Sequence, residues 1–170
     1  MVEFSDLEPQ DSLLGTFSTQ TVESAARGKR LARGVARFFT ALGYSSLVEV
    51  PLPNARRADV LAIDGRGQFL LVEVKSCRAD FHADNKWPEY LEFCDFFYFA
   101  VAADFPRELL PTEAGLLIAD PYSAVIERDT AGRLLAPARR RALLLRFAHL
   151  AAARVQVLSD PLQPAGPRTA

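Results

Sequence analysis

The chain has 170 residues, of which 49% are hydrophobic and 24% are charged, and its formal net charge at pH 7 is −1. This length and composition predict one soluble globular domain and exclude a chain that is disordered throughout. The near-neutral net charge gives no global argument for nucleic-acid binding, so that argument has to rest on local charge.

Basic residues cluster locally. Five of them lie between Arg27 and Arg37, three more form the run Arg139–Arg141, and the N-terminus is acidic. We expect the first cluster to form a solvated helix face that can also follow a DNA backbone.

The two cysteines, Cys77 and Cys94, fit neither a disulfide framework nor a CxxC metal site, so we expect two partly buried thiols in a reducing compartment. No stretch approaches the roughly 20 apolar residues that cross a bilayer. The N-terminus also lacks the basic-then-apolar order of a signal peptide. We therefore expect a cytoplasmic, bacterial-type protein without a membrane partner.

The first elements in chain order are an arm, a helix and an edge strand. Residues 1–18 are polar and poorly patterned, which predicts a flexible N-terminal arm. From Thr19 to Leu42 apolar residues recur at steps of three and four, which predicts a helix that ends at Gly43. The segment "SSLVEVPLP" follows, and its two prolines indicate an edge strand.

A hairpin comes next, and the remaining chain alternates helices and strands. "DFHADNKWPEYLEFC" predicts a helix, "DFFYFAVA" and "GLLIAD" predict buried strands, and "SAVIERD" predicts a weaker strand paired with "RLLAP". A last helix is predicted from Pro137 to Leu158, followed by a disordered tail over 159–170. This order predicts a single α/β domain over 19–158, with a central mixed sheet flanked by helices.

The hairpin "RRADVLAIDGRGQFLLVEVKS" carries three charged residues inside otherwise apolar strands: Asp59 in the first, and Glu73 and Lys75 in the second. Because side chains alternate along a strand, Glu73 and Lys75 share one face. If the turn is the three-residue loop "GRG", Asp64 opposes Gln68 and Asp59 opposes Glu73. A slip of one residue would move Asp59 to the other face.

Two carboxylates that face each other across a strand pair repel, so they need a compensating charge. Mg²⁺ supplies one, since it binds one or two carboxylates together with water and phosphate oxygens. Such an ion polarises a phosphodiester and activates water, and Lys75 would orient that water or stabilise charge on the phosphorus. The competing interpretation is that Lys75 simply neutralises Glu73.

Asp59, thirteen intervening residues and then Glu73-Val74-Lys75 resemble the core of the PD-(D/E)xK nuclease superfamily. The segments "RRADVLAI", "FLLVEVKS", "ADFHADNKWPEYLEFCDFFYFAV" and "GLLIAD" resemble, more specifically, the MmcB-like DNA-repair protein family. The match runs from about residue 27 to residue 142. It implies a restriction-endonuclease-like core, DNA and repair proteins as partners, and Mg²⁺ or Mn²⁺ as cofactor. By position, Asp59 and Glu73 become metal ligands and Lys75 the catalytic lysine.

The superfamily often adds an acid from its first helix, and Glu23 is the acidic candidate there, with Glu49 on the next strand as the alternative. Ala58 stands where the superfamily's name has proline. Asp80, Asp84 and Lys86 either contact the waters of a metal or a phosphate, or belong to the capped start of a helix.

Three hypotheses follow. The leading one is a metal-dependent DNA-repair nuclease, and the second is a catalytically idle nuclease fold that serves as a DNA-binding or repair-scaffold module. The third is a hairpin with a plain Glu73–Lys75 ion pair and an unrelated binding role. The nuclease interpretation expects the carboxylates of Asp59 and Glu73 to converge within a few Å in an open cleft.

Overall fold

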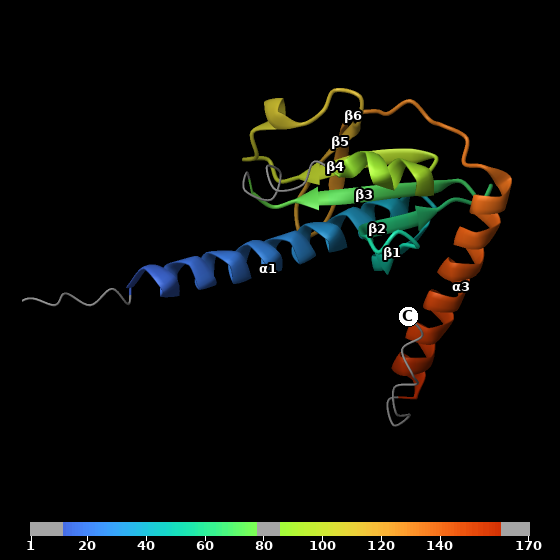
Figure 1. Ribbon diagram of the computed structural model, residues 1–170, viewed down its shortest axis with the longest axis horizontal. Helices are drawn as coiled ribbons and strands as arrows, with labels where there is room; N and C mark the ends of the chain where they lie inside the picture. Colours follow the sequence, from blue (N-terminus) through green and yellow to red (C-terminus); the bar gives the residue numbers. More distant parts are fainter. Residues whose placement is uncertain (1–11, 78–85, 161–170) are drawn as a thin grey trace, which may run out of the picture.

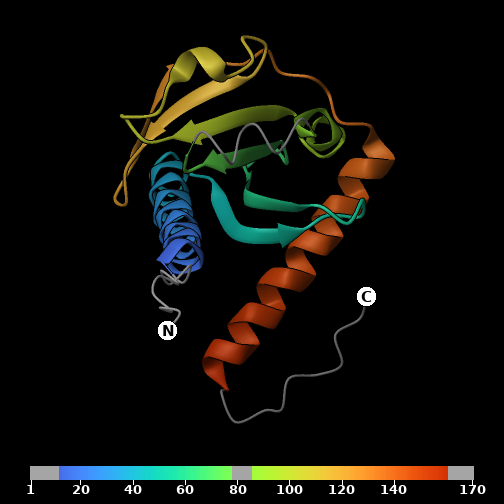
Figure 2. The same ribbon diagram turned by 60° about the vertical axis from the view of Figure 1, so that its left-hand side comes forward.

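One mixed β-sheet organises the part of the chain that the computed structural model describes, residues 12–77 and 86–160 (Figures 1 and 2). Its six strands follow the spatial order β1-β2-β3-β4-β5-β6. The central pairs β3–β4 and β4–β5 are parallel, and the other neighbours are antiparallel. The strands are β1 (Ser45–Pro51), β2 (Arg57–Ile63), β3 (Phe69–Lys75), β4 (Phe96–Val101), β5 (Gly115–Ala119) and β6 (Ala124–Arg128).

Helices cover both faces of this sheet. The long helix α1 (Ser12–Ala41) packs on one face, and its N-terminal part runs out beyond the sheet (Figure 1). The 3-10 helix η1 (Trp87–Phe93) and the first half of α3 (Pro137–Ser159) pack on the other face. A short 3-10 turn, η2 (Arg107–Leu109), links β4 to β5.

Alternating side chains of β3 feed two separate cores. Leu70, Val72 and Val74 join α1 residues in one core, whereas Phe69 and Leu71 join η1 and α3 in the other. Each fully buried large apolar side chain contributes roughly 1.5–3 kcal/mol relative to exposure, so β3 is held firmly from both sides. Its charged positions lie within this doubly covered strand.

The structure confirms the mixed α/β sheet, the edge position of β1, the two buried parallel strands β4 and β5, and the last helix. The first helix begins at Ser12 rather than at Thr19. Extending an existing helix costs much less than nucleating a new one, so turns with weak apolar patterning add to its N-terminus. Residues 1–11, 78–85 and 161–170 lie outside the described residues.

Two expected elements differ. The segment before β4 is a 3-10 helix over Trp87–Phe93 within the described residues. The segment "RLLAP" is not a strand, and β6 pairs with β5 instead. The physical reason is Asp95, which accepts the N–H of Leu135 on its side chain (2.9 Å) and the N–H of Arg133 on its carbonyl (2.8 Å). These bonds hold the segment beside the starts of β3 and β4.

Helix α3 corrects the expectation that no stretch reaches membrane length. Its length and its mean hydropathy of 1.3 meet the requirement for a bilayer span, and 6% of that apolar window is buried. Length and composition alone do not show that α3 crosses a membrane. Arg146 and Arg154 in this part of the helix donate to main-chain carbonyls of β1. These contacts tie α3 to the sheet.

Neither cysteine forms a disulfide, as expected. Burial and the neighbouring charge of Asp95 raise the pKa of the Cys94 thiol to about 12, so Cys94 stays protonated and acts as a small core residue.

Candidate active site

The β2–β3 turn sets the register of the charged hairpin. The Asp64 N–H donates to the carbonyl of Gln68 (3.1 Å), and the Asp64 carboxylate accepts the N–H of Arg66 and of Gln68. Gly67 takes φ +78°, the left-handed conformation that this three-residue loop requires. Val60 pairs with Val72, so the register is the one predicted from the sequence, but the ladder ends at this pair and the expected Asp59–Glu73 pair does not form.

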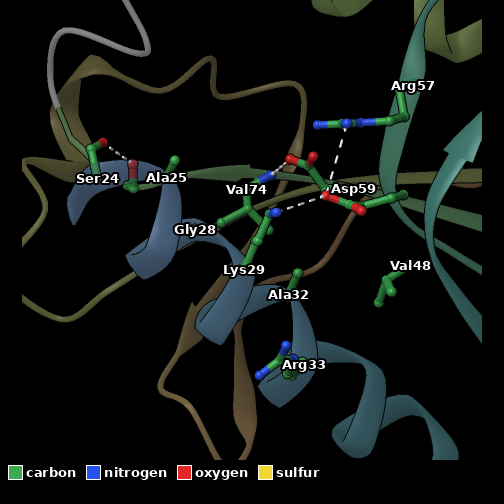
Figure 3. Close-up of a pocket in the computed structure, with 12 residues that line it drawn as sticks. Ser24, Ala25, Gly28, Lys29, Ala32, Arg33, Val48, Arg57, Asp59 and Val74 are labelled. Carbon is green, nitrogen blue, oxygen red and sulfur yellow. Dashed lines mark hydrogen bonds and ion pairs between the residues drawn. The ribbon is translucent and has the colours of Figure 1, made fainter. Parts of the chain in front are cut away.

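The strands separate one residue beyond that pair. Oδ2 of Asp59 accepts the main-chain N–H of Val74 at 2.8 Å (Figure 3), in place of a backbone carbonyl of β2. Strand N–H groups point within the plane of the sheet, so the Asp59 carboxylate lies at the edge of β3 rather than on either face.

Strand β1 is irregular at the same level. Glu49 has φ +50°, and the ladder passes from Val48–Val60 to Val50–Ala58 without a pair at Glu49. Val48 and Val60 belong to the α1 core, whereas Val50 and Ala58 belong to the opposite core. Both strands therefore turn over here, which aims Glu49 and Asp59 away from regular sheet positions.

Arg154 of α3 stabilises this irregularity. Its guanidinium donates to the carbonyl of Val48 at 2.7 Å and to the carbonyl of Glu49 at 3.0 Å. A left-handed conformation costs a non-glycine residue about 1–3 kcal/mol, and these two charge-assisted bonds offset part of that cost.

A cavity of about 320 Å³ opens between α1 and the separated strands (Figure 3). Lys29 of α1 and Arg57 of β2 reach into it from opposite sides, and both form ion pairs with Glu49. Asp59 lines the same cavity. The other lining residues are Ser24, Ala25, Gly28, Ala32, Arg33, Val48, Val74 and Ser76.

Glu73 and Lys75 are buried, with exposures of 7% and 4%, and their side chains form an ion pair at 3.2 Å. By strand alternation they lie on the face opposite Val74, toward the η1 and α3 core. Burying a charged pair inside an apolar sheet costs desolvation free energy. Apolar side chains of similar size would fill the same space without that cost, so the pair is not needed for stability alone.

The positive charge of Lys75 is close enough to Asp59 to lower the pKa of its carboxyl group. Burial raises the pKa of Asp59 above its usual range, and the charge of Glu49 raises it further. The Val74 N–H, Lys75 and Arg57 act in the opposite direction without cancelling the effect of burial. A cation placed at this carboxylate would stabilise its ionised form.

Carboxylate oxygens are the donor type that a hard divalent cation prefers, and the number of donors limits how such an ion could bind. Within the described residues no group of three or more His, Cys, Asp or Glu side chains is placed to hold a metal ion. Two carboxylates with water and phosphate oxygens are enough for Mg²⁺. Asp59 and Glu73 do not line one cavity, however, so their convergence on a shared ion stays a prediction.

Of the two candidates for the additional acid, the structure places Glu49 beside Asp59. Glu23 is exposed and lines a different hollow, with Arg27 and Arg30. Asp80 and Asp84 lie outside the described residues.

Sequence reasoning missed Lys29 and Arg57, which line the cavity, and Arg154, which supports Glu49 from α3. Lys29 falls within a basic helix whose charges read as a solvated face, and Arg57 belongs to the hairpin but received no role. The helix period for Lys29 and the hairpin register for Arg57 could have predicted that both side chains lie near the charged hairpin. Arg154 gave no local signal, because its partner Glu49 is 105 residues away in sequence.

Comparison with known proteins assigns a family. The family described as "DNA repair protein MmcB-like" matches residues 18–162. The chain belongs to the MmcB-like family. A solved structure, the SPO1766 protein of unknown function from Silicibacter pomeroyi, is similar to this MmcB-like chain, with 48% sequence identity and a TM-score of 0.79. The match covers 83% of this chain and 97% of that chain. Among curated proteins, none matches this chain.

Proposed function

We propose that this MmcB-like protein acts on DNA during repair and hydrolyses phosphodiester bonds with Mg²⁺ or Mn²⁺. The family description supports the repair role. The observation that carries the chemistry is the buried Glu73–Lys75 pair of β3 beside the partly buried Asp59, at the point where β2 and β3 separate. The spacing of Asp59, Glu73 and Lys75 in the sequence, which resembles the pattern of the PD-(D/E)xK nucleases, also supports the proposal.

Asp59 and Glu73 would hold the ion, which when bound supplies Lewis-acid polarisation of the phosphate and a more acidic water. Lys75 would donate hydrogen bonds to the charge that develops on the phosphate oxygens. Its ammonium pairs with Glu73 at 3.2 Å, so it lies beside a carboxylate that would hold the ion. The hydrogen bond from the Val74 N–H holds the Asp59 carboxylate at the edge of β3.

The test is DNA cleavage by the purified protein on single-stranded, duplex, flap and damaged substrates. Wild type should cleave at least one of them with Mg²⁺ or Mn²⁺, and chelation with EDTA should abolish this. Glu73→Gln and Lys75→Met should each lower the rate by at least about 100-fold, the size of effect typical of catalytic groups.

Glu127→Gln is the matched control, because Glu127 also pairs with a cation (Arg107) but lies on β6. Cleavage that is equal in wild type, Glu73→Gln and Lys75→Met would contradict the assignment, and unchanged circular dichroism of the variants would show that the fold is intact.

The second candidate function is a non-cleaving DNA-binding or scaffold module. The observation that favours it is the neutralisation of Glu73 by Lys75, together with the separate cavity that Asp59 lines. DNA binding that is insensitive to metal, with no turnover on any of the substrates, would support it. In either case we propose a cytoplasmic location, with DNA and other repair proteins as partners.

A further inference from the structure

The cavity beside Asp59 holds two cations that share one carboxylate oxygen. Oε1 of Glu49 lies 3.9 Å from Nζ of Lys29 and 3.8 Å from Nη1 of Arg57. Both distances exceed those of a hydrogen bond, so the Glu49 carboxylate attracts each cation without a direct hydrogen bond to it.

These ion pairs are also exposed. The side chains of Lys29, Arg57 and Glu49 are 64%, 60% and 41% exposed. Exposed pairs of this kind contribute about 0–1 kcal/mol each, so another anion can displace the carboxylate at low cost. The Glu49 main chain stays in place during such an exchange, because Arg154 binds its carbonyl.

The cavity offers room and further basic groups. Arg33, one helical turn beyond Lys29, also lines it (Figure 3). The space near Gly28 is open, since a Cβ built there would meet only the Ser76 side chain, at 3.9 Å. The cations of α1 and β2 therefore face an accessible volume that Asp59 also lines.

We propose that Lys29 and Arg57 form a phosphate clamp for the DNA backbone, and that the Glu49 carboxylate occupies this clamp in the free protein. This proposal rests on the proposed action on DNA. A phosphodiester presents two non-bridging oxygens that share one negative charge, so each cation can form a charge-assisted hydrogen bond that the single Glu49 oxygen does not form here. DNA binding would then place a phosphate next to Asp59.

Glu49 acts in this scheme as an internal competitor. Its negative charge neutralises the clamp in the free protein and repels the incoming phosphate. Removing that charge should therefore tighten DNA binding, whereas removing either cation should weaken it.

The experiment measures the affinity for a fluorescent single-stranded and a duplex oligonucleotide, by anisotropy, in EDTA and at several salt concentrations. Lys29→Gln and Arg57→Gln should each weaken binding by about 3- to 10-fold and reduce the salt slope by about 0.7–0.9. Glu49→Gln should tighten binding by about the same factor. The absence of metal separates this readout from cleavage.

Arg107 and Glu127 provide matched controls. They form an ion pair of similar exposure, 43% and 46%, between η2 and β6, away from the cavity. Arg107→Gln and Glu127→Gln change the net charge by the same amounts, so any excess effect of the cavity variants is local.

The inference is overturned if wild type binds DNA but the cavity variants do not differ from their controls, or if Glu49→Gln weakens binding. If wild type binds neither oligonucleotide at any salt concentration, the proposed action on DNA fails first and the clamp fails with it. Thermal unfolding of each variant distinguishes lost binding from lost fold.

Discussion

At the scale of the residue, the carboxylate of Asp95 accepts several hydrogen bonds within the described part of the core. It is 1% exposed and accepts the N–H groups of Phe69 (2.7 Å) and Leu135 (2.9 Å). Arg140 binds both of its carboxylate oxygens, at 2.6 and 2.8 Å. One carboxylate therefore joins the start of β3, the segment before α3 and the first turns of α3.

This arrangement sets the pH dependence of folding. Burial alone would raise the pKa of Asp95, but the hydrogen bonds from Arg140, Leu135 and Phe69 outweigh it and hold the pKa below its usual range. A carboxyl group whose pKa is depressed by folding stabilises the fold above its unfolded pKa of about 3.9, and that stabilisation disappears as pH falls through the lower folded value.

We expect Asp95→Asn to lower the free energy of unfolding at pH 7 by about 3–5 kcal/mol, because it leaves the Arg140 guanidinium without its charged partner. The loss relative to wild type should shrink as the pH is lowered below about 4. Urea unfolding at several pH values checks both statements.

Glu113→Gln, which removes an exposed carboxylate, is the control and should change the stability at pH 7 by less than about 0.5 kcal/mol. A difference between Asp95→Asn and wild type that grows on acidification would contradict the role of the ionised Asp95.

At the scale of the element, α1 reaches the sheet through a close backbone contact. A Cβ built at Gly34 would lie 1.9 Å from the carbonyl oxygen of Asp120 and 3.0 Å from that of Ser123. Both atoms belong to the main chain between β5 and β6, so they cannot move aside as a flexible side chain would. A glycine is required here because of space rather than because of its backbone conformation.

We expect Gly34→Ala to destabilise the protein by about 1–3 kcal/mol or more, because the helix must move away from the β5–β6 turn. Gly28→Ala in the same helix is the matched control. It should be neutral or stabilising by up to about 1 kcal/mol, since alanine favours helix and the site is open. Denaturant unfolding of the two variants gives the comparison, and equal stability would show that the contact does not restrict the helix.

At the scale of the whole molecule, α3 connects the C-terminal end of the described chain to the edge strand β1. Arg146 donates to the carbonyl of Pro51 at 3.1 Å, and Arg154 donates to two carbonyls near the cavity. Much of the apolar surface of α3 beyond its first turns is exposed, including Val155, Val157 and Leu158. The second half of α3 therefore contacts the rest of the protein through the polar contacts of Arg154 as well as through Leu150, which packs against the core.

We expect Arg154→Ala to cost about 1–3 kcal/mol of stability, from the loss of two bonds to a charged donor. Hydrogen exchange of the β1 amides around Glu49 should also become faster, since the left-handed residue loses its support. Arg146→Ala, which removes one carbonyl contact, should have the smaller effect on both measurements. Similar effects of the two substitutions would argue against a special role for Arg154.

The sequence by itself predicted the strands of the sheet along the chain and the register of the central hairpin, but not the pairing of β6 with β5. Alternating and continuous apolar runs identified β2 to β5, and the glycine turn set Val60 against Val72. These features depend on neighbours in the chain, so local patterns and turn chemistry are sufficient to predict them. The same pattern placed Glu73 and Lys75 on one face, and their direct ion pair was the competing interpretation.

Only the tertiary structure decided where these charges meet other groups. It separated β2 from β3 at Asp59, turned β1 over at Glu49, and brought Lys29 and Arg57 to one carboxylate. It also placed Glu49, rather than Glu23, in the cavity that Asp59 lines. These outcomes depend on the packing of α1 and α3 against the sheet, and contacts between residues so distant in sequence leave no periodic or spacing signal in the chain.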